Sequence, residues 1–233
     1  IVFLKKITGF SSDNLALQQI ALHLGTLISI LIYYHQDIKE LFLKLNQRYT
    51  LYIFIGTLPL VFSGLFLFDL FDGINNNIEL AFPIASYCIL ITGFILFMTK
   101  FFNNQDNSLN WKIVLVIGFM QCLAVLPGIS RSGATISTSV LLGVDKEKSA
   151  RFSFLMVVPL ILGKMAKDIL SGEISFTSTE SLPLLFGFIS SFFVGVFSCK
   201  LMIKIVKKSK LKYFAFYCIV VGSSIIFYSF FNA

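Results

Sequence analysis

The residue types that can do chemistry cluster in one short stretch, Pro127-Gly128-Ile129-Ser130-Arg131-Ser132-Gly133. A single guanidinium, that of Arg131, stands between two hydroxyl groups, and Thr135 follows two residues after the stretch. Arginine offers a planar fork of donors that matches phosphate oxygens. Gly128 and Gly133 let the backbone turn tightly and approach a ligand closely. Together these residues are typical of a site for a phosphate or a diphosphate.

A helix is expected to begin near Gly133, and its start would strengthen this site. The unpaired N–H groups and the positive end of the helix dipole would point into the loop. A competing interpretation is that Ser130 only caps this helix and that Arg131 reaches to a lipid headgroup. We favour the anion site, because the loop is centred between two short apolar arms and a reach from there to the headgroups would be strained.

The loop belongs to a chain of long apolar segments. Hydrophobic residues make up 56% of the 233 residues and charged residues only 13%, against about 25% charged in soluble domains. Runs of about twenty apolar residues can span a bilayer as helices. Six such spans are predicted, at 15–34, 51–70, 83–102, 152–170, 182–203 and 213–231. The fold class is therefore an all-α integral membrane protein in a single polytopic domain.

Loop charges indicate the orientation of these spans. Lys and Arg occur in four connecting segments, 35–50, 100–112, 145–151 and 200–212. The segments 69–82 and 171–181 carry acidic residues but no Lys or Arg. The positive-inside rule places the first group in the cytoplasm and the second group outside, with the C-terminus outside. Lys164 and Lys167 count against this orientation. The net charge of +7 is thus a topology signal and does not indicate nucleic-acid binding.

The apolar stretch 111–144 follows a different pattern. It is too long for one span, and the polar loop interrupts it. Both of its flanks are predicted to be cytoplasmic, so the stretch must enter and leave the membrane on the same side. Its arms, 113–126 and 134–144, are each too short to span. We therefore predict a re-entrant helical hairpin whose loop lies at membrane depth, where irregular backbone must be buried in protein or line a wet cavity.

The sequence also suggests an inverted repeat. Leu142-Gly143-Val144, followed by Ala150, is similar to Thr8-Gly9-Phe10, followed by Ala16. Three predicted spans follow each copy of this motif. Because an odd number of membrane crossings separates the two copies, the second repeat would have the inverted membrane topology of the first. We divide the chain into the remainder of a first repeat, 1–110, and a second repeat, 111–233. The hairpin that would pair with 111–144 is expected upstream of Ile1.

The stretch from Gln121 to Ser137 closely resembles the second signature of the undecaprenyl-diphosphate phosphatases, the bacitracin-resistance family. The segments Arg151–Pro159 and Ala21–Leu27 are also similar to that family. The resemblance implies a bacterial inner-membrane enzyme that hydrolyses undecaprenyl diphosphate to the monophosphate. Such an enzyme recycles the lipid carrier of peptidoglycan synthesis and is linked to bacitracin resistance.

The resemblance also implies roles for individual residues. Arg131 would contact the diphosphate, and we assign Arg131 and Ser130 to catalysis. Substrate binding is assigned to Gly128, Ser132, Gly133, Thr135 and His23. For His23, the competing interpretation is a histidine in the span that is hydrogen-bonded to a neighbour such as Gln19.

A divalent cation, Mg²⁺ or Ca²⁺, is expected from the resemblance. In that family an ExxxE element followed by a Ser-Ser-Thr-Gly-His loop supplies a Glu pair and a His, and this chain lacks that signature. We expect it upstream of Ile1, so no metal ligand is assigned in this chain. The expected partners are a polyprenyl diphosphate lipid and the bilayer, with no nucleic acid, and a homodimer is left open.

Two other functions are considered. A transporter or flippase for an anionic lipid or small anion would also use broken helices and an intramembrane arginine. The Glu pair of the ExxxE element would distinguish a phosphatase from a transporter, because hydrolysis needs a base or a metal site and translocation does not. A purely structural subunit would leave the polar loop unexplained. The four cysteines, Cys88, Cys122, Cys199 and Cys218, lie singly in apolar runs, which argues against zinc or a disulfide framework.

Overall fold

The computed structural model describes most of the chain as α-helix. The described residues are 15–42, 47–66, 73–74, 77–102, 107–170, 181–207 and 210–231. The chain forms two compact units. Of the described residues, the first unit contains those within 52–153 and 205–231, and the second contains those within 15–51 and 154–204. The predicted motif Thr8-Gly9-Phe10 and the predicted outer loop 171–181 lie largely outside the described residues.

A helix forms at each of the six predicted spans. These helices are α2 (Leu15–Tyr33), α4 (Gln47–Phe66), α6 (Ile78–Met98), α9 (Lys146–Leu170), α10 (Ser181–Lys207) and α11 (Leu211–Phe231). A further short helix, α3 (His35–Phe42), follows α2. The all-α fold class is confirmed in the described part of the chain.

Among the described residues, three helices are long and apolar enough to cross a membrane, by length and composition. Their apolar stretches are Glu79–Met98, Leu182–Val206 and Leu211–Ser229. Shorter apolar helices occur at Leu17–Tyr33 and Trp111–Leu123. Charged residues occupy both ends of α9, which shortens its apolar part. Near its C-terminal end Lys164 forms an ion pair with Asp168 at 2.9 Å, and this pairing lowers the cost of burying the Lys164 charge.

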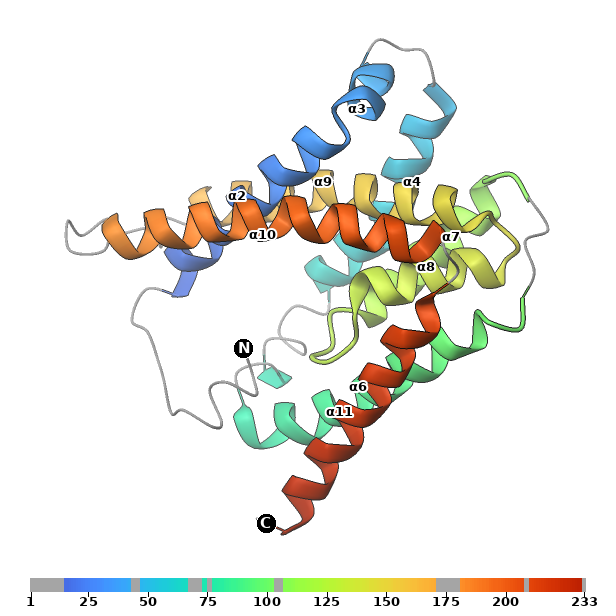
Figure 1. The fold of residues 1–233 in the computed structure, drawn as a ribbon. Helices are drawn as coiled ribbons and strands as arrows, with labels where there is room; N and C mark the ends of the chain where they lie inside the picture. Colours follow the sequence, from blue (N-terminus) through green and yellow to red (C-terminus); the bar gives the residue numbers. More distant parts are fainter. Residues whose placement is uncertain are drawn as a thin grey trace. The chain divides into compact units, whose positions relative to one another are not determined.

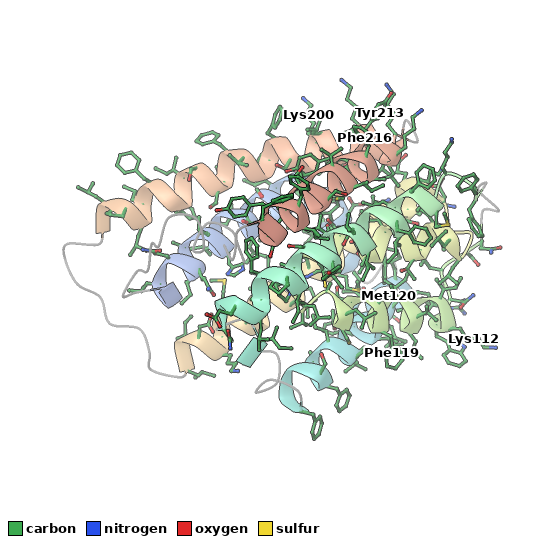
Figure 2. The ribbon with its side chains drawn as sticks, turned by 90° about the horizontal axis from the view of Figure 1, so that it is seen from below. Lys112, Phe119, Met120, Lys200, Tyr213 and Phe216 are labelled. Atoms are coloured by element: carbon green, nitrogen blue, oxygen red, sulfur yellow. The ribbon has the colours of Figure 1, made fainter. Side chains whose placement is uncertain are left out.

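Within the first unit, α6 and α11 lie side by side (Figure 1). Small residues bring them close: a side chain at Gly93 would meet the Ala215 carbonyl oxygen at 3.1 Å. Close approach at small residues is the usual basis of helix association in membranes. Large apolar side chains cover the outer surface of these helices, such as Phe94 of α6 and Phe216 of α11, which are 61% and 69% exposed; Figure 2 labels Phe216. Such a surface is suited to lipid.

The stretch 111–144 forms two short helices joined by a turn (Figure 1). These are α7 (Trp111–Leu123, 13 residues) and α8 (Arg131–Leu141, 11 residues). At 1.5 Å per residue they measure about 20 Å and about 16 Å, well short of the about 30 Å hydrocarbon core. The two helices pack against each other, and α8 also packs against α6.

The two ends of this hairpin are tied together. The Asn107 N–H donates to the Gly143 carbonyl at 3.0 Å, and the Asn107 side-chain amide donates to the Leu142 carbonyl at 3.0 Å. The residue before the first arm therefore lies beside the residues after the second arm. The predicted helix–loop–helix break in this stretch is confirmed.

Candidate functional site

Helix α8 begins two residues earlier than predicted, at Arg131 instead of near Gly133. Ser130 is its N-cap, and the Ser130 Oγ accepts a hydrogen bond from the Gly133 N–H at 3.1 Å. Serine is strongly preferred at this position because it satisfies one of the unpaired N–H groups of the first turn. Ser130 therefore does cap the helix, as the competing interpretation held, and its exposed hydroxyl keeps its own proton for a further bond.

The first turn of α8 offers donors that no described residue accepts. The Ala134 N–H is bonded to the Ser130 carbonyl, whereas the N–H groups of Arg131 and Ser132 have no acceptor among the described residues. The guanidinium of Arg131 is half-buried and likewise forms no hydrogen bond or ion pair within the described part of the chain. A desolvated charge without a partner is costly. The arrangement is therefore suited to an anion.

The loop before α8 is anchored on α6. Gly128 has φ +93°, a conformation that side-chain-bearing residues rarely adopt, and a Cβ there would collide with the Ala85 carbonyl oxygen. Further along, the Ser130 N–H donates to the Thr92 Oγ1 at 3.3 Å. Gly128 is thus required by close backbone contact with α6, and Thr92 fixes the cap residue itself.

The other side of α8 is joined to α9 by hydroxyl groups. The Thr135 Oγ1 donates to the Arg131 carbonyl at 2.9 Å and lies 2.6 Å from the Ser153 Oγ. One turn further along, the Ser149 Oγ donates to the Ser139 Oγ at 2.8 Å. All four side chains are buried. Because the proton of Thr135 is engaged in this way, its predicted contact with the substrate stays a prediction.

Two buried polar side chains in the hairpin have no hydrogen-bond partner in the part of the chain that the structure describes. The Gln121 Oε1 and Nε2, in the last turn of α7, and the Ser137 Oγ of α8 form no hydrogen bond. Gln121 is 1% exposed and Ser137 is fully buried. Buried polar groups in native proteins nearly always have a partner. These atoms therefore mark places where a water molecule or a ligand group could bind.

The fold brings six of the seven predicted site residues together in one turn and the loop before it. They are Gly128, Ser130, Arg131, Ser132, Gly133 and Thr135. His23 lies half-buried on α2 in the second unit, and its predicted role stays a prediction. Sequence reasoning missed Thr92, Gln121 and Ser153. Gln121 and Ser153 do lie in the segments that carry the family resemblance, but no periodicity or spacing singles out Thr92.

Metal binding was tested on the donor set of the described residues. No three His, Cys, Asp or Glu side chains gather there. The described part of the site offers hydroxyl, guanidinium and amide groups, which are not a ligand set for a divalent cation. No chemical step is therefore derived through a metal.

Comparison with known proteins identifies the family. The model of the bacitracin resistance protein BacA matches residues 1–224. A protein named undecaprenyl-diphosphatase from Christiangramia forsetii is 42% identical over 97% of this chain and 88% of its own length. Proteins of the same name from Bacteroides thetaiotaomicron (37% identical, over 92% of this chain and 84% of the relative) and Halothermothrix orenii (32%, over 97% and 88%) are also similar. The chain belongs to the BacA family of bacitracin resistance proteins.

Proposed function

We propose that this protein is a membrane phosphatase that hydrolyses undecaprenyl diphosphate to undecaprenyl phosphate and phosphate. It would thereby recycle the lipid carrier of cell-wall synthesis in the bacterial inner membrane. The observation that carries the proposal is the Arg131 guanidinium at the start of α8, which has no partner among the described residues. The chain is also 42% identical to a protein named for this activity.

The chemistry follows from where negative charge develops. In the overall hydrolysis, the oxygen of a water molecule ends on the terminal phosphorus, the bridging P–O bond breaks, and undecaprenyl phosphate leaves. The protons of the water end on the two released phosphates or in solvent. Arg131 and the N–H groups of Arg131 and Ser132 would neutralise charge on the phosphate oxygens. The Ser130 hydroxyl, whose oxygen accepts from the Gly133 N–H, would donate its proton to another phosphate oxygen. These groups would bind and orient the diphosphate.

The finer architecture is part of the proposal. We infer six spans with a re-entrant hairpin at 111–144, an external C-terminus and an inverted repeat divided at residue 110. The hydrogen bonds from Asn107 to Gly143 and Leu142 support the hairpin. They hold its two ends at the same place, as entry and return on one side of the membrane require.

The divalent cation, Mg²⁺ or Ca²⁺, also remains a proposal, based on the resemblance alone. Removal of divalent cations with a chelator is expected to abolish phosphate release, and Mg²⁺ or Ca²⁺ is expected to restore it. Full activity in excess chelator would show that hydrolysis is independent of the metal.

No contact among the described residues requires a homodimer.

Phosphate release in detergent separates hydrolysis from transport. The protein, expressed from its complete coding sequence and purified in micelles, is expected to release phosphate from undecaprenyl diphosphate. Micelles have no separate compartments, so transport cannot produce this signal. The absence of phosphate release, together with movement of the lipid between leaflets in reconstituted vesicles, would favour a flippase.

A further inference from the structure

A chain of hydroxyl groups links α9 to the backbone of the anion-binding turn. The Thr135 Oγ1 lies 2.9 Å from the Arg131 carbonyl oxygen and 2.6 Å from the Ser153 Oγ. Thr135 has one proton and donates it to the carbonyl, so Ser153 is the donor in the second bond. Thr135 and Ser153 are 1% and 2% exposed. Water therefore cannot easily replace either partner, and the link is held by protein atoms alone.

A second hydroxyl pair joins the same two helices. The Ser149 Oγ donates to the Ser139 Oγ at 2.8 Å, and both residues are buried. Interhelical hydroxyl bonds of this kind hold helices together in apolar surroundings. The pair lies one turn beyond Thr135 and bonds no residue of the loop or of the first turn of α8. It therefore has the same chemistry as the first pair without its connection to Arg131.

We propose that Ser153 is a positioning residue for the phosphate-binding turn. Through Thr135 it would fix the Arg131 carbonyl, and with it the direction in which the guanidinium and the first N–H groups of α8 point. Thr92 holds the Ser130 N–H from the α6 side at 3.3 Å, so the turn is fixed from two neighbouring helices. Small errors in the placement of such groups cost large factors in rate. The inference rests on the proposed function.

The test compares Ser153→Ala with Ser149→Ala in the whole protein. Each variant removes one buried interhelical hydroxyl bond, and Ser149→Ala also removes the bond from Ser149 to the Asp145 carbonyl at 2.7 Å. Ser149→Ala is therefore expected to lower the melting temperature at least as much as Ser153→Ala. Ser153→Ala is expected to lower kcat about tenfold or more, with KM changed by less than about threefold. Ser149→Ala should keep kcat within about twofold of the wild type. Equal kcat values for the two variants would overturn the proposal.

A double-mutant cycle tests the route through Thr135. Thr135→Val removes the hydroxyl and keeps the shape, whereas Thr135→Ser restores the hydroxyl and should recover most of the lost kcat. Once Thr135 is Val, Ser153→Ala is expected to cause no further loss. If the two losses multiply, Ser153 acts by another route and the inference is wrong.

The same variants distinguish a failure of this inference from a failure of the proposed function. A wild-type protein that releases no phosphate would overturn the function. The positioning role is then decided by the rise in melting temperature that inorganic diphosphate produces. A smaller rise for Ser153→Ala than for Ser149→Ala supports the role, and equal rises overturn it.

Discussion

At the scale of single residues, the candidate site contains polar groups that have no partner among the described residues. Arg131, the Gln121 amide and the Ser137 hydroxyl have no hydrogen-bond partner within the part of the chain that the structure describes. Each such group lowers stability. Natural proteins accept this cost mainly at functional sites, so substitutions here should affect stability and activity in opposite directions.

Gln121→Leu tests this trade-off. Leucine fills a similar volume without an amide, so we expect a higher melting temperature. The expected gain in the free energy of unfolding is about 1–3 kcal/mol. Phosphate release is expected to fall at least about tenfold, because the hairpin loses a polar group available to the substrate or to water. Unchanged turnover would exclude Gln121 from the site, and a lower melting temperature would show that the amide is already hydrogen-bonded.

Gly128→Ala tests the contact between the loop and α6. A Cβ there would collide with the Ala85 carbonyl, and φ is +93°, so we expect a loss of about 2 kcal/mol or more in stability and a parallel loss of activity. Gly64→Ala is the control, because a Cβ at Gly64 meets nothing within 4 Å. A Gly128→Ala protein as stable and active as the Gly64→Ala protein would contradict the described loop.

The sequence singled out one loop as the candidate site but not the contacts that hold this loop in place. Residue type alone identified the loop around Arg131, because a guanidinium between hydroxyls and glycines has few roles inside a membrane. The predicted start of α8, near Gly133, is two residues too late. Helix capping and ligand binding by Ser130 were treated as alternatives, although one serine can do both. The partners Thr92 and Ser153 depend on how distant helices pack, which no local pattern records.

At the scale of elements, helices were predicted more reliably than spans. Continuous apolar runs predicted α2, α4, α6, α9, α10 and α11, because a run of that length can bury its backbone only as a helix. Three of the six also pass the criteria of length and composition for crossing. The hairpin was predicted from loop charge: both flanks of the stretch 111–144 carry Lys or Arg, so the stretch must return to the side from which it entered. The hydrogen bonds of Asn107 support the hairpin independently.

Cysteine labelling tests the hairpin directly. In a variant without native cysteines, single cysteines at Lys112 and Lys146, on either side of the hairpin, are expected to react from the cytoplasmic face. A cysteine at Glu79, an exposed residue in the predicted outer segment, should react from the opposite face. Labelling of positions 112 and 146 from opposite faces would show that 111–144 crosses the membrane.

At the scale of the whole molecule, the fold places the Arg131 guanidinium beside the N-terminus of α8, an arrangement suited to an anionic ligand. The apolar outer surface suits lipid, and the polar groups gather in the hairpin and on the helices that pack against it. A lipid diphosphate matches both properties, because its chain belongs in the bilayer and its headgroup needs desolvated donors. The central claim is therefore that Arg131 binds the diphosphate.

The most direct test of that claim is phosphate release by Arg131 variants in detergent, with the melting temperature measured for each. Arg131→Ala and Arg131→Lys are both expected to lose about 30- to 1000-fold in rate, because lysine keeps the charge but not the planar pair of donors. Lys112→Ala, which removes a charge at the start of α7, should turn over normally. Near-normal turnover by an intact Arg131→Ala protein would contradict the account.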